Sequence, residues 1–396
     1  KIIRKMKKFN ILVFTSGRSD FDLLLPLIKN FEKNKIVNLT LLVTGSHLSK
    51  KHGLTLDYIK KKNIKNIKKI DIKCGNVNEK NISSIFSNAQ ILYAKYFSRL
   101  KKKIDISVIL GDRYEALAFA TTCFFSNIPI AHIHGGEITI GAKDDTIRHT
   151  ITKISNLHFV SNKEHKKRVL QLGESKSNVF SCGLLGYENI SKIKLVNKEE
   201  IENSLKFKFD KKTLLVSYHS VTTISKAENI FQFNQILDVL KSYKKFNIIF
   251  NAPNIDPGNA DILIMIKKFI RKNKNAYFFK SLGQKLFFSL VKNSDIFMGN
   301  SSSGILEVPF LNVPVLNIGN RQKGRFQFIK VSNLLAKKNI IKKNIDTIVN
   351  CNTKKIFIKP RLKKNASLII AREIIKKLKS KKNAYLMNKT FNDLNP

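Results

Sequence analysis

The sequence predicts an α/β protein of two domains, each a parallel β-sheet covered by helices on both faces. The chain has 396 residues, more than one ordinary hydrophobic core accommodates, so two domains are expected. Short apolar runs without polar alternation recur along it, which is typical of strands buried on both faces, and helical patterns separate these runs. The runs form two series. We therefore expect two Rossmann-like domains facing a cleft.

The first series predicts five strands in the N-terminal half. These runs are NILVFT (10–15), LTLLVT (39–44), KIDISVIL (103–110), IPIAHI (128–133) and LHFVS (157–161). The first run follows a basic stretch and mimics a signal peptide, but its apolar patch at 11–14 is shorter than the roughly 7–15 residues of a signal core. We expect a buried strand there, and we take Met6 as the natural start.

The second series predicts four strands in the C-terminal half. These runs are TLLVSY (213–218), FNIIFN (246–251), DIFMG (295–299) and VPVLNI (313–318). The two series part near 183–200, which places an N-terminal domain at 1–185 and a C-terminal domain at 186–375. Near the end, ASLIIAREIIKKLKS (366–380) has apolar residues at helical spacing. Residues 376–396 are expected to hold the end of this helix and a frayed tail.

The composition is that of a globular protein. Hydrophobic residues make up 43% and aromatic residues 9% of the chain, which argues against a disordered or fibrous protein. No apolar run approaches the ~20 residues that cross a bilayer. The four cysteines lie far apart without a CxxC pair, so we expect reduced thiols and a cytoplasmic location, with neither a disulfide scaffold nor structural zinc. Cys123 is expected in the core.

The formal net charge of +45 is compatible with nucleic-acid binding. The lysines, however, are spread along the whole chain and form no stripe interleaved with aromatic residues. Lysine, asparagine and isoleucine are all abundant, as expected when AT-rich codons dominate a genome. We therefore expect neither a nucleic acid nor a membrane as partner, and only a general attraction for anionic ligands.

Titratable residues gather at the carboxyl ends of the predicted strands, where ligands bind in open α/β sheets. GDRYEALA (111–118) indicates a glycine turn after a strand, followed by a helix that opens with Asp112 and Arg113. Asp112 is suited to capping that helix, to acid–base chemistry, or to both. Arg18 follows the first strand in the same way.

HIHGGE (132–137) follows another strand and permits two interpretations. His132 and His134 are two residues apart and would point to the same face of a strand. Such a pair either binds a metal, as in hydrolases of the amidohydrolase type, or consists of buried imidazoles with satisfied hydrogen bonds. Glu137 follows a double glycine at the same strand end.

DDTIRHTITKIS (144–155) predicts a helix that begins at Asp144 and Asp145. Acidic residues at a helix start are favoured by the helix dipole, and both can pair four residues on, with Arg148 and His149. Its apolar residues at helical spacing are Ile147, Ile151 and Ile154. Each part has an ordinary structural explanation, but several acids and imidazoles at adjacent strand ends indicate a functional site.

The C-terminal half carries a different pattern. The run SSSG (301–304) follows a predicted strand and opens a helix carrying Glu307. Hydroxyls and backbone N–H groups at a helix start suit a phosphate, and an acid can bind a ribose diol, although a serine run is also a common helix cap. Arg321 follows the next strand, where a guanidinium can bind phosphate oxygens. His219 follows the strand at 213–218.

Together these motifs resemble those of the hydrolysing UDP-N-acetylglucosamine 2-epimerases that feed sialic-acid-type sugar synthesis. The resemblance covers nearly the whole chain and rests on GRSD, GDRYEALA, HIHGGEITIGAKDDTIRHTITKIS, HFVS, the histidine of YHSVT, and GNSSSGILEV followed by GNRQKGR. It implies a glycosyltransferase-B-like (GT-B-like) fold with the nucleotide sugar in the cleft. It also implies a cytoplasmic homo-oligomer, dimer or tetramer, with neither a metal nor another cofactor.

The resemblance implies roles for particular residues. Acid–base catalysis falls on Asp112, Asp144 and Asp145, with Glu137, His134 and His219 as further candidates. Contacts to the UDP-sugar fall on Arg18, Arg113, His219, Ser301, Ser302, Glu307 and Arg321. One departure concerns His134, since the sialic-acid branch has a glutamate there, in HIEGGE. The form HIHGGE also occurs in enzymes of the legionaminic-acid route, which act on UDP-2,4-diacetamido-2,4,6-trideoxy sugars, so two substrates remain open.

The reaction implied by the resemblance explains why acids and imidazoles converge. A base removes the weakly acidic C2 hydrogen while UDP leaves C1, which gives a glycal. Water then adds to the double bond, and an acid returns hydrogen to C2 from the opposite face. Serines and arginines would stabilise the departing pyrophosphate. A GT-B glycosyltransferase, a metal-dependent hydrolase using His132 and His134, and a nucleotide sensor without activity are the alternatives.

Overall fold

The computed structural model describes two compact units. The described residues are 8–49, 54–74, 77–78, 80–253, 258–280, 282–350, 362–380 and 388–394. Unit 1 comprises those of Lys1–Glu137, Asp144–Glu188 and Leu362–Pro396, and unit 2 those of Ile138–Lys143 and Asn189–Arg361. Each unit contains one parallel β-sheet, which confirms the predicted class of two α/β domains.

Unit 1 is built on a seven-stranded sheet with the order β3-β2-β1-β4-β5-β6-β7. Its strands are β1 (Phe9–Thr15), β2 (Val37–Val43), β3 (Ile67–Lys69), β4 (Ile106–Leu110), β5 (Ile130–Ile133), β6 (Leu157–Val160) and β7 (Val179–Ser181). The strand order reverses between β1 and β4, the place where ligands bind in such sheets. The predicted strands are all present. The edge strands β3 and β7 were not predicted, because three residues leave too little pattern.

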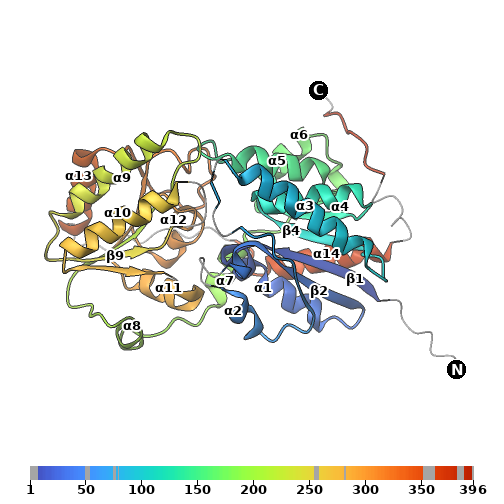
Figure 1. Ribbon diagram of the computed structural model, residues 1–396, viewed down its shortest axis with the longest axis horizontal. Helices are drawn as coiled ribbons and strands as arrows, with labels where there is room; N and C mark the ends of the chain where they lie inside the picture. The colour runs from blue at the N-terminus through green and yellow to red at the C-terminus, as the bar shows by residue number, and fades with distance from the viewer. Residues whose placement is uncertain are drawn as a thin grey trace. The chain divides into compact units, whose positions relative to one another are not determined.

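Helices cover both faces of the unit 1 sheet. They are α1 (Arg18–Lys33), α2 (Leu56–Lys60), α3 (Ile82–Ser98), α4 (Tyr114–Phe125), α5 (Asp144–Ile154), α6 (Lys163–Gln171) and α14 (Ala366–Lys379), with 3₁₀ turns η1 (Gly45–Leu48) and η3 (Lys176–Asn178). The unit changes after Glu188, within α7 (Leu185–Lys192). On one face α3, α4 and α5 surround Phe14 and Phe119, whose ring centroids are 4.5 Å apart (Figure 1). On the other face α1 and α14 pack around Ile11 and Val13. Alternate residues of β1 therefore enter two separate cores.

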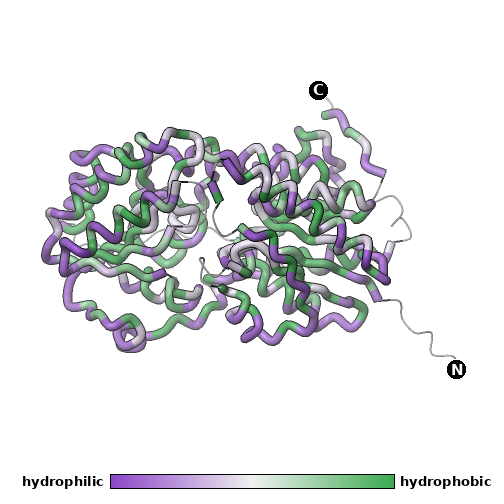
Figure 2. The backbone as a smooth tube through the Cα atoms, viewed as in Figure 1, coloured by the Kyte–Doolittle hydropathy of each residue, from purple (hydrophilic) through white to green (hydrophobic). Residues whose placement is uncertain are grey.

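Unit 2 repeats this plan on a six-stranded sheet with the order β10-β9-β8-β11-β12-β13. Its strands are β8 (Thr213–Ser217), β9 (Asn247–Asn251), β10 (Ala276–Phe279), β11 (Ile296–Gly299), β12 (Val315–Ile318) and β13 (Ser332–Leu334). Its helices are α8 (Lys198–Leu205), α9 (Lys226–Leu240), α10 (Asn259–Lys272), α11 (Gly283–Lys292), α12 (Ser303–Leu306) and α13 (Lys338–Asn350), with the 3₁₀ turn η4 (Val308–Leu311). In Figure 2 the hydrophobic stretches lie mostly in the interior of each unit and the hydrophilic ones mostly along its periphery. The edge strands β10 and β13 were again not predicted.

The chain divides differently from the prediction at its C-terminal end. α14 packs on unit 1, because its buried Ile370 and Ile374 join the core against α1. Residues 362–375 therefore do not belong to the predicted C-terminal domain of 186–375. The predicted boundary at 185 lies close to the observed change of unit after Glu188.

Two further segments were not foreseen. Ile138–Lys143 packs on unit 2 although the residues on either side of it belong to unit 1. Within unit 2, the N–H of Ile140 donates to the oxygen of Lys323 at 2.9 Å. The described part of the predicted frayed tail, 388–394, is instead bound to unit 1, since Lys389 forms an ion pair with Glu174.

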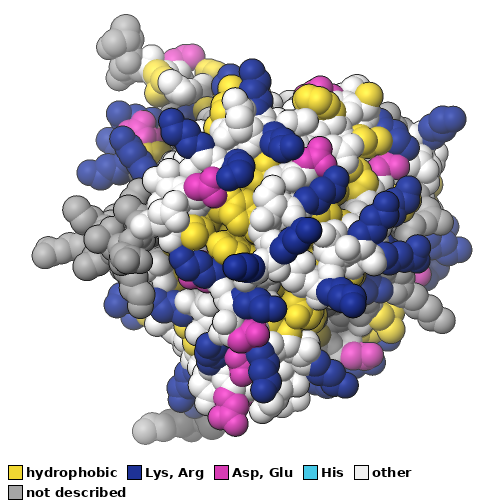
Figure 3. Space-filling view, turned by 90° about the vertical axis from the view of Figure 1, so that its left-hand side faces the viewer, with side chains coloured by type: hydrophobic (Ala, Val, Ile, Leu, Met, Phe, Trp, Pro, Cys, Tyr) yellow, Lys and Arg dark blue, Asp and Glu magenta, His cyan; other side chains and the backbone are white. Residues whose placement is uncertain are grey.

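Three of the four cysteines and many surface charges belong to the described residues. Cys74, Cys123 and Cys182 are free and buried, with Cys123 in the core, while Cys351 and Met6 lie outside the described residues. On the face shown in Figure 3, Lys and Arg side chains are scattered among acidic and hydrophobic ones. Within the described ranges, no helix has the length and apolar character needed to cross a membrane.

Candidate active site

One buried arginine joins the acidic residues of unit 1. Arg148, on α5, is 1% exposed. Its Nη1 donates to the backbone oxygen of Glu137 at 2.8 Å and lies 3.3 Å from Oδ1 of Asp145, and its Nη2 binds the carboxylate of Asp112. The guanidinium therefore holds together the loops after β4 and β5 and the first turn of α5. The carboxylates of Asp112 and Asp145 and the backbone of Glu137 meet here, and Asp144 begins the same helix.

Asp112 lies outside the N-cap position of α4. The N-cap residue is Arg113, and Asp112 precedes it, after Gly111 with a φ of 84°. A left-handed φ of this kind favours glycine. The side chain of Asp112 is 22% exposed while its carboxylate contacts Arg148, so it is anchored without being enclosed. The structure thus gives Asp112 an ion pair with Arg148, and it gives the N-cap position of α4 to Arg113.

His132 fits the interpretation of a buried imidazole with satisfied hydrogen bonds. It is fully buried. Its Nε2 lies 2.7 Å from the backbone oxygen of Gly111, and its Nδ1 lies 3.1 Å from Oγ1 of Thr152. Burial lowers its pKa to about 3, so the ring is neutral at neutral pH. Because both ring nitrogens have protein partners, His132 offers no nitrogen to a metal.

His134 lies beyond the end of β5 and has a left-handed φ of 67°. The two imidazoles of HIHGGE therefore do not share a strand face, contrary to the prediction. Nδ1 of His134 lies 3.2 Å from Oε1 of Glu137, and both side chains are buried. Gly136 permits this turn, since its φ is 75° and a Cβ there would lie 2.4 Å from the oxygen of His165. Across the described ranges, no three His, Cys, Asp or Glu side chains are grouped to hold a metal ion.

The two arginines expected to contact a UDP-sugar from unit 1 are oriented by carboxylates. Arg113 forms a bidentate ion pair with buried Glu115, with N···O distances of 3.1 and 3.0 Å. Arg18 lies 3.6 Å from Asp22 and 5.0 Å above the ring of Tyr58. Each arginine side chain is 22% exposed. A guanidinium has five N–H donors, so one such group can bind a carboxylate and an anionic ligand at the same time.

Asn300, which is 1% exposed, organises the corresponding site of unit 2. Its side-chain amide accepts from the N–H of His219 at 2.7 Å and donates to the oxygen of His219 at 2.7 Å. Its backbone oxygen accepts from Arg321 at 3.2 Å and from Gln322 at 3.0 Å. One residue thereby connects the loops after β8, β11 and β12. The expected ligand-binding residues His219, Ser301 and Arg321 converge there.

The serine run begins a helix of only one turn, α12. Ser302 is its N-cap residue and Glu307 ends it, so the longer helix expected to carry Glu307 does not form. Pro309 explains the break, because proline has no backbone N–H to continue the helix. Ser302 and Glu307 therefore lie at opposite ends of a single turn.

Three residues that hold these sites together were missed in the sequence. The sequence pattern explains Arg148 by an ordinary pair on its own helix and indicates no role for Asn300 or Gln322. A signal for Arg148 existed: most basic residues of this chain are lysines, and arginine is preferred over lysine where one planar group binds several oxygens. For Asn300 the sequence contains no indication of this role other than its position directly before the serine run.

Comparisons with known proteins identify relatives of the chain. The family model described as UDP-N-acetylglucosamine 2-epimerase matches residues 29–371. The chain is 38% identical, over 323 residues, to the GDP/UDP-N,N'-diacetylbacillosamine 2-epimerase (hydrolyzing) of Campylobacter jejuni, and the match covers 81% of this chain and 83% of that protein. It is 35% identical, over 396 residues, to the polysialic acid biosynthesis protein P7 of Escherichia coli, covering 98% of each.

The fold is shared with solved structures. The crystal structure of UDP-GlcNAc 2-epimerase from Neisseria meningitidis bound to UDP-GlcNAc matches with a TM-score of 0.77 and 18% identity, covering 93% of this chain and 100% of that one. At that identity the likeness shows the fold alone, and it confirms the predicted GT-B-like class.

The buried histidines predict a loss of stability in acid. Burial lowers the pKa of His47 and His132 to about 3 and that of His219 well below its usual value. Unfolded histidines bind protons below about pH 6.5, so between about pH 6.5 and 3 the unfolded chain binds more protons and stability falls as pH falls. Each histidine contributes a slope of up to about 1.4 kcal/mol per pH unit.

His132→Gln should therefore reduce the slope of unfolding free energy against pH by about 1.4 kcal/mol per unit near pH 4 to 5. Urea titrations of both chains at several pH values measure it. An unchanged slope would mean that His132 takes up its proton in the folded state.

Proposed function

The chain belongs to the UDP-N-acetylglucosamine 2-epimerase family, and we propose that it is a hydrolysing member. It would convert UDP-N-acetylglucosamine and water into N-acetylmannosamine and UDP, for sialic-acid-type sugar synthesis. The observation that carries this proposal is the set of Arg148 contacts, which brings together the carboxylates of Asp112 and Asp145 and the backbone of Glu137. Carboxylates so gathered suit a reaction that takes a proton from carbon and returns one.

Asp112 is the proposed base. It would accept the C2 proton as the C1–O bond breaks and UDP leaves with the bonding electrons, which forms the glycal. A carboxylate must be ionised to accept a proton, and Arg148 keeps a positive charge beside it. The partial exposure of Asp112 leaves one side of the carboxylate for a substrate.

The second proton transfer is assigned to the residues around the HIHGGE turn. His134 and Glu137 form a buried pair at 3.2 Å that can hold a single proton between them. This pair would give the proton to C2 from the opposite face while water adds at C1. Asp144 and Asp145, at the start of α5, are the alternative donors.

The residues around Asn300 are the proposed nucleotide site. Arg321 and the hydroxyls of Ser301 and Ser302 would bind the diphosphate, and Glu307 would bind the ribose diol. The neutral imidazole of His219 can donate one hydrogen bond to the same ligand. Arg18 and Arg113 of unit 1 would add positive charge for the UDP that leaves.

A second candidate substrate is the UDP-2,4-diacetamido-2,4,6-trideoxy sugar. One observation favours it: the Campylobacter jejuni relative, at 38% identity, is a hydrolysing epimerase for diacetylbacillosamine. The reaction would be the same, since both sugars carry an acetamido group at C2. The two candidates differ at C4 and C6 of the sugar.

Incubation with each UDP-sugar in D₂O tests the reaction. UDP-N-acetylglucosamine should yield free UDP and N-acetylmannosamine without an acceptor, and solvent deuterium should appear at C2, because C2 loses and regains its proton. NMR and mass spectrometry identify the products.

Other outcomes would each point elsewhere. UDP-N-acetylmannosamine as the only product would make the enzyme non-hydrolysing. Sugar transfer that requires an acceptor would indicate a glycosyltransferase. Faster turnover of the diacetamido sugar would select the second substrate, and product without deuterium at C2 would rule out elimination.

Asp112→Asn should keep the fold and UDP binding but lower kcat by about 10²–10⁴-fold, the usual worth of one acid–base group. Ser302→Ala is the matched control and should weaken UDP binding by about 1 kcal/mol, the worth of one neutral hydrogen bond, with little change in kcat. Calorimetry with UDP and steady-state kinetics separate the two effects. A near-normal kcat in Asp112→Asn would show that Asp112 does not transfer the proton. His134→Phe tests the second proton transfer in the same way, by its effect on kcat.

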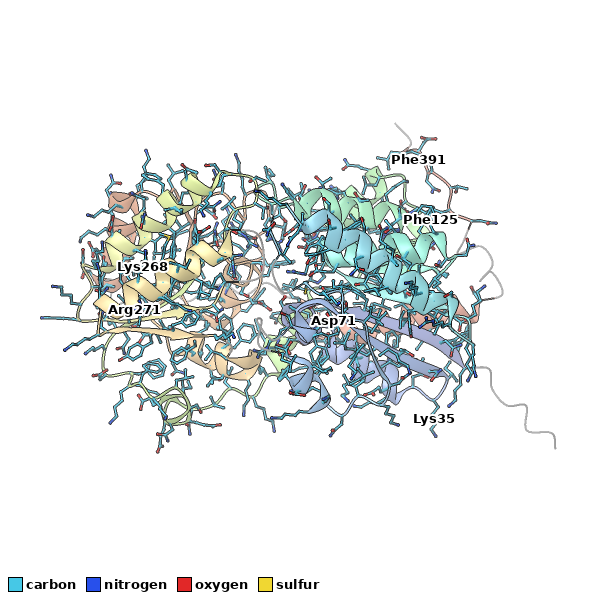
Figure 4. The ribbon with its side chains drawn as sticks, in the orientation of Figure 1. Lys35, Asp71, Phe125, Lys268, Arg271 and Phe391 are labelled. Atoms are coloured by element: carbon cyan, nitrogen blue, oxygen red, sulfur yellow. The ribbon has the colours of Figure 1, made fainter. Side chains whose placement is uncertain are left out.

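We also propose a cytoplasmic homo-oligomer, a dimer or tetramer. The free, buried thiols suit a reducing compartment. On the neighbouring helices α3 and α4, the exposed fractions are 53% for Ile91, 50% for Phe124 and 80% for Phe125. Figure 4 labels Phe125, which projects from the end of α4. Apolar side chains this exposed are typical of surfaces that a partner covers.

Sedimentation velocity over a range of concentrations measures the assembly. Phe125→Glu should shift a dimer or tetramer towards the monomer, because the new charge would be buried at a contact. A wild-type chain that stays monomeric throughout the range would contradict the proposal.

A further inference from the structure

The segment 388–394 binds the C-terminal end of α5. Nζ of Lys389 donates to the backbone oxygens of Lys153, in the last turn of α5, and of Ser155, just after it, the latter at 2.5 Å. The last carbonyls of a helix have no partner within the helix and carry partial negative charge. Lys389 therefore supplies this helix end with a positively charged donor.

The same ammonium group reaches a buried carboxylate. Nζ of Lys389 lies 2.7 Å from Glu174, whose side chain is 4% exposed. Nε2 of His158, on β6, lies 2.9 Å from Glu174, and Nζ of Lys153 lies 3.3 Å from it. Burial tends to raise the pKa of Glu174, but the hydrogen bonds from His158 and Lys389 outweigh it and lower the pKa. Glu174 is therefore an anion that ties the segment to β6 and α5.

The rest of the segment adds independent contacts. The N–H of Asn392 donates to the oxygen of Gly173 at 3.0 Å. The ring of Phe391, labelled in Figure 4, lies against Gly173, where a Cβ would come within 2.4 Å of it. Nζ of Lys153 lies 4.6 Å above the same ring. The segment is thus attached at Lys389 and again at 391–392.

The opposite end of α5 carries the candidate active site. Asp144 and Asp145 form its first turn and Arg148 its second. A helix of 11 residues is about 16 Å long, and backbone hydrogen bonds join its successive turns, so α5 connects the contacts of Lys389 to Arg148. Arg148 in turn holds the carboxylate of Asp112.

We propose that Lys389 is a positioning residue for the reaction, which holds α5 so that Arg148 keeps Asp112 in its place. This inference rests on the function proposed above. Lys389 contacts the C-terminal end of α5 and Glu174, whereas the candidate active site lies at the N-terminal end of α5. Lys389 would act on the reaction only through the helix.

Three variants test the proposal. Lys389→Met removes the positive charge from a side chain of similar length, and Lys389→Arg keeps the charge. Lys379→Met is the control, because it removes an exposed lysine of α14. A misplacement of about 1 Å can cost about 100-fold in rate. We expect kcat for UDP release to fall about 10-fold in Lys389→Met, with KM changed less than about 2-fold. Lys389→Arg should recover most of kcat, and Lys379→Met should match the wild type. All assays are run at a temperature at which circular dichroism shows every variant folded.

Hydrogen exchange provides a readout that does not depend on activity. Backbone amides of α5 should exchange faster in Lys389→Met, while those of β8 and β9 in unit 2 stay unchanged. Unchanged α5 exchange would overturn the attachment itself. Faster exchange with wild-type kcat would overturn the positioning role and leave Lys389 a stabilising contact. If the wild-type chain releases UDP from neither UDP-sugar, the proposed function is overturned, and the positioning role with it. Hydrogen exchange of the α5 amides still shows whether Lys389 holds the helix.

Discussion

The unit 1 site depends on the burial of one guanidinium group. Removing a cation such as Arg148 from water costs several kcal/mol, and this cost is offset only where its donors meet oxygens in good geometry. Here the oxygens come from Asp112, Glu137 and Asp145, on three separate elements. Loops after β4 and β5 that would otherwise be independent are therefore held to one helix. In unit 2 the neutral residue Asn300 does the same: its side-chain amide binds the loop after β8, and its backbone oxygen binds the loop after β12.

Much of the fold could be predicted because buried parallel strands have a strong sequence pattern. The central strands are continuous apolar runs, and residues that follow them converge because the carboxyl ends of parallel strands lie along one edge of the sheet. Asp112 and Glu137 were placed by this rule alone. Their link through Arg148 could not be predicted, since Asp112 and Arg148 lie 36 residues apart and the pattern of α5 alone suggested pairs within the helix. The geometry of His134 was also missed: β5 ends at Ile133, as the apolar run does, but the same-face argument treated His134 as a strand residue, whereas its φ is left-handed.

The scarce carboxylates of this chain hold separate elements together. Only 28 acidic residues accompany 73 basic ones, yet Glu174 and Glu188 are both buried. Glu174 joins β6, α5 and the segment 388–394. Glu188, on α7, accepts from the N–H and the hydroxyl of Ser367, both at 2.7 Å, at the start of α14. Burying a carboxylate is costly without such donors, and each one therefore fixes how the elements that supply the donors pack together.

The place of α14 in unit 1 has a consequence for synthesis on the ribosome. Domains commonly fold in order as they emerge, the N-terminal one first. The core that contains β1 and α1 is completed by Ile370 and Ile374, which are translated only after all of Asn189–Arg361, the main part of unit 2. The first half of the chain must therefore wait with one apolar face uncovered while the second half is made. Unit 2, whose sheet is contiguous in sequence, can mature before the unit that precedes it.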